Sequence, residues 1–414
     1  MGDLTATDRM PTVLVIGTLD TKGEECAFLR ARLTGAGCQV VVIDAGILGK
    51  SGIPADIPRE EVARAAGTEL TSLVGSGDRS KAIETMSRGA AEVVRRLHEQ
   101  GRVDGIIGIG GSNGSTLVST AMGSVPLGVP KLMVSTMAAG DTRPYVGTMD
   151  LTMMYSVVDL AGLNSVSERV LANAAGAVAG MARSAVDAMP ITTSKPSIGA
   201  TMYGVTSGAV TAARQVLERR GYEVLGFHAT GSGGRAMEAL MKAGRLAGVL
   251  DITTTELADE LAGGMLSAGP DRLETAGSLG LPQAVSVGAL DMVTFGPIDT
   301  VPEKFRGRQL YQHNPTITIM RTTVEECAQL GRIIADKLNR AKGPVAVFIP
   351  LSGVSAISTA GGVFYDPEAD RALFDALRQE LDPRIDLVEM EAAINDSAFG
   401  RAMAERISTF LRAA

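Results

Sequence analysis

Short apolar segments that end in glycine-rich loops alternate with amphipathic segments through most of this 414-residue chain. The first unit of this kind is TVLVIGTLDTKGEECAFLRARLTGAGCQVVVIDAG, residues 12–46. We interpret it as a strand at 12–16, a helix over about 24–33 and a second strand at 39–43. A strand, a helix and another strand imply parallel pairing with a right-handed crossover. The sequence therefore predicts an α/β fold with parallel sheets.

The rest of the first half continues this alternation. The pattern predicts a helix at 80–99 and strands at 104–109 and 130–136. A segment rich in small residues at 151–190 is expected to be helical and to link the two halves of the chain. Together these elements predict a doubly wound layer structure.

The second half repeats the order of elements, because residues 198–231 again alternate strand, helix and strand. Two further pairs of segments correspond: AGVLDITTTELADEL at 247–261 with DGIIGIGGSNGSTL at 104–117, and LPQAVSVGALD at 281–291 with VPKLMVSTMAAGD at 129–141. These correspondences predict an internal duplication. We expect two Rossmann-like lobes with parallel doubly wound sheets, at 1–190 and 191–414.

Composition argues against several classes of protein. A net charge of -7 and an aromatic content of 4% offer no general positive field and few stacking platforms, so we expect no nucleic-acid ligand. The polar N-terminus lacks the features of a signal peptide, and no apolar run approaches the roughly 20 residues that span a bilayer. We expect a cytoplasmic protein without membrane association. Cys26, Cys38 and Cys327 lack metal-ligand spacing and are expected to be buried apolar residues.

The stretch GIGGSNGSTL at 108–117 joins a predicted strand to a predicted helix. Its unobstructed backbone N–H groups, its hydroxyl side chains and the helix N-terminus suit a phosphate group. It matches neither GxGxxG nor GxxxxGK[ST], and its glycines could serve only a tight turn. A second loop, HATGSGGR at 228–235, repeats the chemistry, with Arg235 able to grip an anion.

Several ionisable residues stand at or just after predicted strand ends. The aspartates are Asp20, Asp44, Asp141, Asp251 and Asp291. Each carboxylate could hold Mg²⁺, accept a hydrogen bond from a ribose hydroxyl or cap the next helix. Lys22 and Arg143 could contact phosphates or pair with the preceding aspartates. His228 is a candidate general acid or base, or a residue at the edge of the core.

Several longer blocks resemble one known family. They include VLVIGTLDTKGEE, GIGGSNGST, STMAAGDT, FHATGSGGRAME, GVLDITTTELADEL and SAGPDRLE. Together they resemble the ATP-binding domain of plant tobamovirus-resistance proteins and of uncharacterised bacterial relatives, over nearly the whole chain. The resemblance implies a two-lobed Rossmann-like protein that binds ATP and forms a homodimer. Because a TIM-barrel-like domain follows this region in the plant proteins, it also implies a separate TIM-barrel partner protein.

The chain departs from the family pattern inside the first glycine loop. The family sequence GGSGGT is GGSNGS here, so Asn113 brings a side chain close to the expected phosphate. Asparagine still tolerates a left-handed backbone. Similarly, the family sequence STMASGDT is STMAAGDT here.

Two hypotheses about function follow. In the first, an enzyme binds ATP and uses it on a small acidic metabolite in a cleft between the lobes. The nucleotide contacts would be Gly110, Gly111, Ser112, Asn113, Gly114, Ser115, Thr116, Thr136 and Gly140, with Thr230, Gly231, Gly233, Gly234 and Arg235 of the second lobe. Asp20, Asp141 or His228 would act as base, and Mg²⁺ would neutralise charge during hydrolysis or phosphoryl transfer. In the second, a non-catalytic module responds to the nucleotide and docks on a partner such as a TIM-barrel protein.

Overall fold

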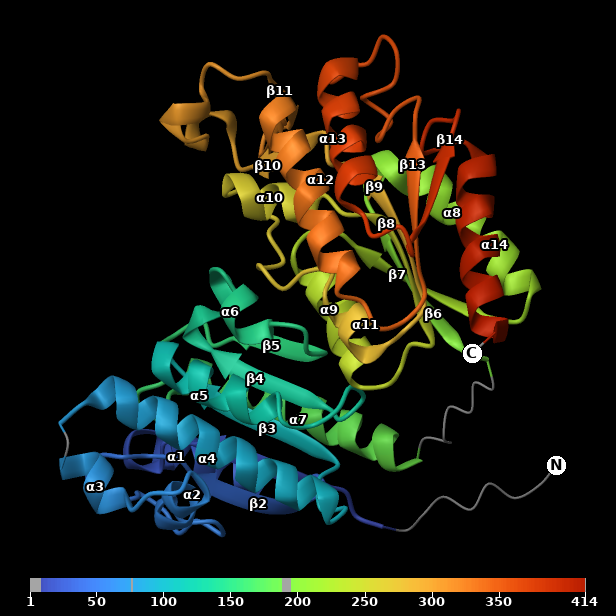
Figure 1. Cartoon of the computed structure of the whole chain (residues 1–414). Coiled ribbons are helices and arrows are strands. Elements are labelled where there is room, and N and C mark those ends of the chain that lie inside the picture. The colour runs from blue at the N-terminus through green and yellow to red at the C-terminus, as the bar shows by residue number, and fades with distance from the viewer. Residues whose placement is uncertain (1–8, 76, 188–194, 414) are drawn as a thin grey trace. The chain divides into compact units, whose positions relative to one another are not determined.

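The computed structural model describes residues 9–75, 77–187 and 195–413, and the chain forms two compact units, Met1–Ile191 and Thr192–Ala414 (Figure 1). Each unit is a parallel sheet covered by helices on both faces. The predicted α/β fold with two Rossmann-like lobes is confirmed.

The first unit contains a five-stranded sheet in the order β2-β1-β3-β4-β5. Its strands are β1 Thr12–Gly17, β2 Gln39–Asp44, β3 Gly105–Gly110, β4 Lys131–Ser135 and β5 Leu151–Tyr155. All four neighbouring pairs are parallel. The chain builds outward from β1 to β2 and then continues on the other side of β1 with β3. The order of strands therefore reverses between β1 and β3.

Side chains of β1 show why both faces of this sheet are apolar. Val13 and Val15 pack on the face covered by α1 (Leu19–Gly35) and α7 (Ser165–Asp187). Leu14 and Ile16 pack on the face covered by α4 (Arg79–Glu99) and α5 (Ser112–Met122). Successive side chains of a strand point to opposite faces, so a strand covered on both sides is continuously apolar. Shorter helices complete the unit: α2 Arg59–Ala65, α3 Leu70–Gly75, η1 Thr136–Ala139 and α6 Arg143–Val146.

The second unit contains a six-stranded parallel sheet in the order β14-β13-β9-β8-β6-β7. Its strands are β6 Ser197–Met202, β7 Glu223–His228, β8 Gly248–Thr253, β9 Gln283–Gly288, β13 Val345–Pro350 and β14 Asp386–Met390. The first five follow the order of β1 to β5, as a duplication predicts, and β14 extends the edge. Between β9 and α12 the chain adds a three-stranded antiparallel sheet of β10 Met292–Phe295, β11 Leu310–Asn314 and β12 Ile317–Arg321.

Helices cover the second sheet on both faces as well. They are α8 Ser207–Arg219, α9 Ser232–Lys242, α10 Glu256–Ala262, α11 Thr275–Leu279, α12 Val324–Asn339, α13 Pro367–Glu380 and α14 Ser397–Ala413, with the short turns η2 Gly204–Thr206, η3 Ile298–Thr300 and η4 Glu303–Phe305. Residues of α8 and α14 share one core cluster, and residues of α12 and α13 share another. The expected burial of Cys26, Cys38 and Cys327 is confirmed.

Two predicted elements were wrong. The first helix begins at Leu19, directly after β1, and not near residue 24; Lys22 interrupts it with a φ of -130°. Residues 151–155 were expected to be helical but form β5, which pairs with β4. The sequence LTMMY mixes the strand-favouring Thr152 and Tyr155 with leucine and methionines that also suit a helix, and pairing with the edge of β4 decides its conformation. The long helix starts only at Ser165, and 188–190 lie outside the described residues.

Within the described part of the chain, we find no helix with the length and apolar character that crossing a membrane requires.

Candidate functional site

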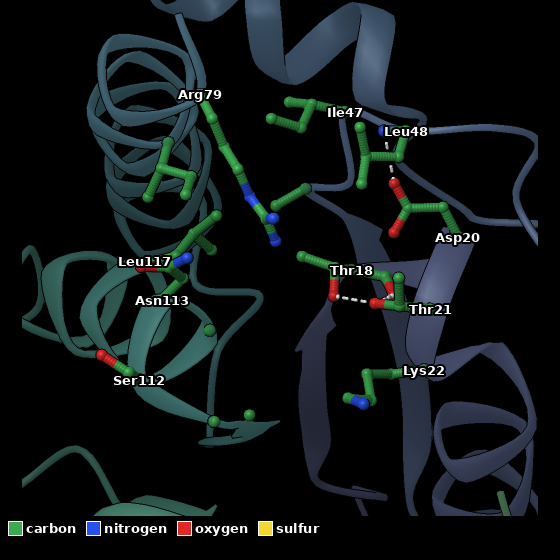
Figure 2. Close-up of a pocket in the computed structure, with 15 residues that line it drawn as sticks. Thr18, Asp20, Thr21, Lys22, Ile47, Leu48, Arg79, Ser112, Asn113 and Leu117 are labelled. Atoms are coloured by element: carbon green, nitrogen blue, oxygen red, sulfur yellow. Dashed lines mark hydrogen bonds between the residues drawn. The ribbon is translucent and has the colours of Figure 1, made fainter. Parts of the chain in front are cut away.

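A cavity of about 320 Å³ lies in the first unit at the carboxyl ends of β1, β2 and β3 (Figure 2). Its lining residues are Thr18, Asp20, Thr21, Lys22, Ala45, Ile47, Leu48, Arg79, Ile83, Gly110, Gly111, Ser112, Asn113, Gly114 and Leu117. In open parallel sheets, ligands bind outside the carboxyl ends of the strands where the strand order reverses. The loops after β1 and β3, on either side of that reversal, form two walls of this cavity.

The N-terminus of α5 opens onto the cavity. Gly111 precedes the helix and makes no side-chain cap, and the first turn contains no acidic residue. The N–H of Ser115 donates to the carbonyl of Gly111 at 2.8 Å. The N–H groups of the preceding Ser112, Asn113 and Gly114 have no acceptor among the described residues. Open donors at the positive end of a helix dipole favour an anion.

The glycines of this loop serve two different purposes. A Cβ atom on Gly110 would lie 2.7 Å from the backbone of Gly114, so glycine lets β3 and α5 approach closely. At Gly111 the nearest obstacle to a Cβ atom is the hydroxyl of Thr136, at 3.6 Å. Gly110 is therefore required by packing, whereas Gly111 leaves space at the cavity. Thr136, a predicted nucleotide contact, lies near Gly111 but is not among the residues that line the cavity.

Arg79 contributes a cation that no local motif indicates. It is the first residue of α4, which Asp78 caps by accepting from the N–H of Lys81. Its side chain reaches into the space between Asn113 on one side and Thr18 on the other (Figure 2). Its guanidinium makes no hydrogen bond or ion pair with any described residue. An unpaired arginine beside an open helix N-terminus strengthens the preference for an anion.

Lys22 and Asp20 bring further charge to the cavity from the start of α1. The ammonium of Lys22 donates to the carbonyl of Leu160. The Oδ2 atom of Asp20 accepts a hydrogen bond from the N–H of Leu48 at 2.6 Å. Asp20 is the one carboxylate among the lining residues, against the two cations of Lys22 and Arg79. The cavity is therefore net positive, as a polyanion requires.

An apolar surface faces these polar groups. It consists of Ala45, Ile47 and Leu48 after β2, with Ile83 of α4 and Leu117 of α5. Ile47 and Leu48 lie across the cavity from Ser112 (Figure 2). A cavity with one apolar wall and a few convergent polar groups fits a ligand that joins a flat ring to an anionic tail.

Other residues of the predicted phosphate loop have internal partners. Ser115 is buried, and its hydroxyl lies 2.6 Å from the hydroxyl of Ser135. The hydroxyl of Thr116 donates to the carbonyl of Ser112 at 3.2 Å. Ser115 therefore ties α5 to β4, while Thr116 lies beside a second hollow between α4 and α5.

The predicted aspartates of this unit differ in access. Asp44 is fully buried and accepts from the N–H groups of Leu19 at 3.1 Å and Gly46 at 2.8 Å. Gly140 and Asp141 are exposed and do not line the cavity. Asp141 accepts hydrogen bonds from the side chain and the backbone N–H of Arg143, including one from Nε at 2.9 Å. These hydrogen bonds lower the pKa of Asp141. A carboxylate with a lowered pKa is a poor general base.

The glycine loop of the second unit is already occupied. The N–H groups of Gly231 and Gly234 donate to Oε1 of Glu256 at 2.7 and 3.0 Å. Glu256 is fully buried, and its Oε2 accepts from Nε of Arg272 at 2.6 Å. Arg272 also makes two hydrogen bonds of 2.6 Å to the carboxylate of Asp251. An internal carboxylate thus lies where the sequence predicts a phosphate.

The remaining predicted residues of this unit surround the occupied loop. A Cβ atom on Gly233 would lie 1.8 Å from the carbonyl oxygen of His228, so Gly233 is required by packing. The hydroxyl of Thr230 donates to the same carbonyl at 3.3 Å. Arg235 is exposed. The His228 ring is exposed at the end of β7, with its centroid 5.3 Å from that of Tyr203.

Carboxylates that could hold a metal are scattered. Asp291 is fully buried; burial raises its pKa to about 6, and its Oδ2 accepts from the hydroxyl of Ser355 at 2.7 Å. No group of three or more histidine, cysteine, aspartate or glutamate side chains is placed to hold a metal ion in the part of the chain that the structure describes.

Two family models match the chain. Residues 11–187 match the N-terminal domain, and residues 195–411 the C-terminal domain, of an uncharacterised protein family (UPF0261). A UPF0261 protein of Clostridium tetani is 50% identical over 396 residues, covering 95% of this chain and 98% of that protein.

A plant protein aligns with nearly the whole chain. The tomato (Solanum lycopersicum) ToMV resistance protein Tm-1(GCR237) is 40% identical over 421 residues, covering 97% of this chain and 56% of the tomato protein. Likeness to solved structures is distant: a UDP-GlcNAc 2-epimerase of Methanocaldococcus jannaschii is 7% identical, with a TM-score of 0.22 over 67% of this chain and 83% of its own. The resemblance noted in the sequence is confirmed, and the chain belongs to the uncharacterised protein family UPF0261.

Proposed function

We propose that the first unit binds ATP in the cavity at the ends of β1, β2 and β3. The observation that carries the proposal is the uncapped N-terminus of α5, which opens onto the cavity that the unpaired Arg79 also lines. This combination occurs where the strand order reverses, the usual ligand position of such sheets. The family resemblance supports ATP as the nucleotide.

Each wall of the cavity has a part in this proposal. The polyphosphate accepts hydrogen bonds from the N–H groups of Ser112, Asn113 and Gly114, and Arg79 of the neighbouring helix α4 binds it as well. The adenine ring packs on the apolar surface that includes Ile47.

Asp20 is the residue suited to a bound Mg²⁺ ion. Its Oδ2 holds the N–H of Leu48, which leaves Oδ1 without a partner among the described residues. One carboxylate together with phosphate oxygens is a common set of Mg²⁺ ligands. The ion would neutralise part of the negative charge of the phosphates, and Asp20 would hold it in the cavity.

If the first unit is an enzyme, the reaction class that we propose is hydrolysis of ATP or phosphoryl transfer to a small acidic metabolite.

The composition of the cavity favours a second candidate function, a non-catalytic module that responds to the nucleotide. Asp20 is the one titratable acid among the lining residues, no histidine lines the cavity in the described structure, and Asp141 is paired with Arg143. A phosphate-release assay with ATP and Mg²⁺ separates the enzyme from the non-catalytic module. Phosphate release that is lost in Asp20→Asn, while this variant still binds ATP, would show that the first unit is an enzyme.

Calorimetric titration of ATP·Mg²⁺ tests the site itself. Gly111→Asp places a negative charge at the open helix N-terminus, and its Cβ atom would meet no atom closer than the Thr136 hydroxyl at 3.6 Å, so the protein should fold and ATP binding should be lost. Arg79→Ala should weaken binding by about tenfold or more, the usual value of a charge-assisted hydrogen bond.

Two matched controls accompany these variants. Lys81→Ala removes a positive charge from the same turn of α4 outside the cavity, and Ser232→Asp places a carboxylate at the start of α9. Both should bind ATP as the unchanged protein does. If Ser232→Asp loses ATP binding while Gly111→Asp retains it, the nucleotide binds at the loop of α9 and not at the loop of α5.

Assembly is proposed from the family resemblance alone. We propose a homodimer and a separate TIM-barrel protein as a partner. Light scattering of the purified protein tests the dimer, and a monomer at all concentrations would contradict it. Co-purification with a TIM-barrel protein encoded in the same genome, with and without ATP, tests the partner.

A further inference from the structure

A second cavity lies within the other unit, at the carboxyl ends of β13 and β14. Its volume is about 510 Å³, and its walls are the 351–366 loop, one side of α13 and Glu391, which follows β14. It lies away from the strand-order reversal between β6 and β8. The family assignment and the nucleotide proposal leave this cavity without a role.

The loop that forms one wall is held firmly in place. The N–H of Ser355 donates to the hydroxyl of Ser358 at 2.9 Å, and the hydroxyl of Ser355 donates to Asp291 at 2.7 Å. Nε of Arg321 donates to the carbonyl of Phe364 at 2.9 Å. These buried hydrogen bonds fix the conformation of the loop, so the wall that it forms is present before a ligand binds.

Most charged groups around this cavity have partners within the protein. Asp370 is largely buried and accepts from Arg321 at 2.6 Å. Arg378 pairs with Asp375 at 2.5 Å. These pairs fix the floor and one side of the cavity but leave little charge for a ligand.

Arg371 and Glu391 are the exceptions. Both line the cavity, and neither makes a hydrogen bond or an ion pair with a described residue. One unpaired cation and one unpaired anion therefore line the same cavity. Phe374, which is 5% exposed, adds an apolar surface between the charged groups of α13.

We propose that this cavity binds a small molecule that carries both an ammonium and a carboxylate group, as an α-amino acid does. The planar guanidinium of Arg371 accommodates the carboxylate with two parallel hydrogen bonds. The carboxylate of Glu391 accepts from the ammonium. A ligand with one sign of charge satisfies only one of the two free groups.

Calorimetric titration of the full chain with glycine, L-serine and L-glutamate tests the proposal. At least one of these amino acids should bind, and Arg371→Ala and Glu391→Gln should each weaken it by about tenfold, as loss of a charge-assisted contact does. Arg371→Lys should retain part of the affinity. Succinate and putrescine, which each carry one sign of charge, should bind more weakly. Absence of binding by all three amino acids would overturn the proposal, as would equal binding of succinate.

Two further variants separate this cavity from other surfaces. Ala360→Trp fills the cavity without a change of charge and should abolish binding, whereas Arg401→Ala removes an exposed arginine of α14 and should have no effect. Amino-acid binding that survives in Ala360→Trp would place the ligand elsewhere. ATP titration should be the same in all these variants, so a failure of the nucleotide site would be seen independently.

Discussion

Each unit has a glycine-rich loop at the N-terminus of a helix, and the two loops differ in whether their N–H groups have a partner within the protein. At α5 the loop opens onto a cavity with an unpaired arginine. At α9 the N–H groups of Gly231 and Gly234 are bonded to Glu256, which is paired with Arg272. The two loops take different places in their sheets, because α5 follows β3 whereas α9 follows β7, the counterpart of β2. The loop of α5 is open, whereas Glu256, from the helix after β8, fills the loop of α9 with an internal carboxylate.

A glycine loop at a helix N-terminus can therefore bind an anion, but the loop sequence does not identify which anion binds there. In the second unit, the protein's own carboxylate satisfies the donors, and Arg272 balances its charge. Buried networks of this kind are sensitive to the loss of one partner, because the others are left without compensation. Substitutions in the buried network of the second unit should therefore lower the stability of the protein, whereas substitutions at the open loop of the first unit should weaken ligand binding.

The largest expected effect is that of Arg272→Met. It leaves Asp251, Glu238 and Glu256 buried without their cation, and the free energy of unfolding should fall by roughly 3–5 kcal/mol. Urea denaturation measures this. Arg79→Ala removes an unpaired arginine from the other unit and should change stability by no more than about 0.5 kcal/mol. Equal losses in the two variants would contradict the comparison.

The second expected effect is a dependence on pH that arises in the second unit. Burial raises the pKa of Asp259 to about 7, above the value of about 3.9 for an unfolded chain. The folded state holds an extra proton between these values, so this contribution to stability is full below pH of about 4 and is lost as the pH rises to about 7. Denaturation at several pH values should show a steeper loss in the unchanged protein than in Asp259→Asn. Identical slopes would exclude this role of Asp259.

A smaller effect should follow from adding one methyl group to each loop. In Gly234→Ala the Cβ atom would meet Oε2 of Glu256 at 2.1 Å, and the overpacking should cost about 1–3 kcal/mol. In Gly111→Ala the nearest atom is 3.6 Å away, so thermal unfolding should change little. If Gly111→Ala proved the more damaging of the two, the first loop would be packed and not open.

The smallest effect concerns the residue that departs from the family pattern. Asn113 is exposed at the start of α5, and its backbone N–H is the group that faces the expected phosphate. Asn113→Gly keeps this N–H and should change ATP affinity by less than about threefold, because only an exposed side chain is removed. A larger change in calorimetric titration would give the Asn113 amide a direct contact with the nucleotide.

Much of the fold could be predicted because its signals are local. Strands such as β3, GIIGIG at 105–110, are continuous apolar runs, and parallel strands covered by helices need no other pattern. The errors arose where distant residues decide the outcome. Residues 151–155 become a strand because β4 offers its edge, and α1 begins at Leu19 because the carboxylate of Asp44 accepts its N–H group.

The parallel sheets, the two lobes and the glycine loops at the carboxyl ends of strands follow from local sequence patterns, because strand and helix periods and turn residues act over a few positions. Which of the two loops is open depends on tertiary contacts. A helix N-terminus binds whatever anion the fold brings to it, and Glu256 and Arg272 reach Gly231 from other elements. Arg79 likewise reaches the first loop from the start of α4. These contacts join residues far apart in the chain, and no local pattern records them.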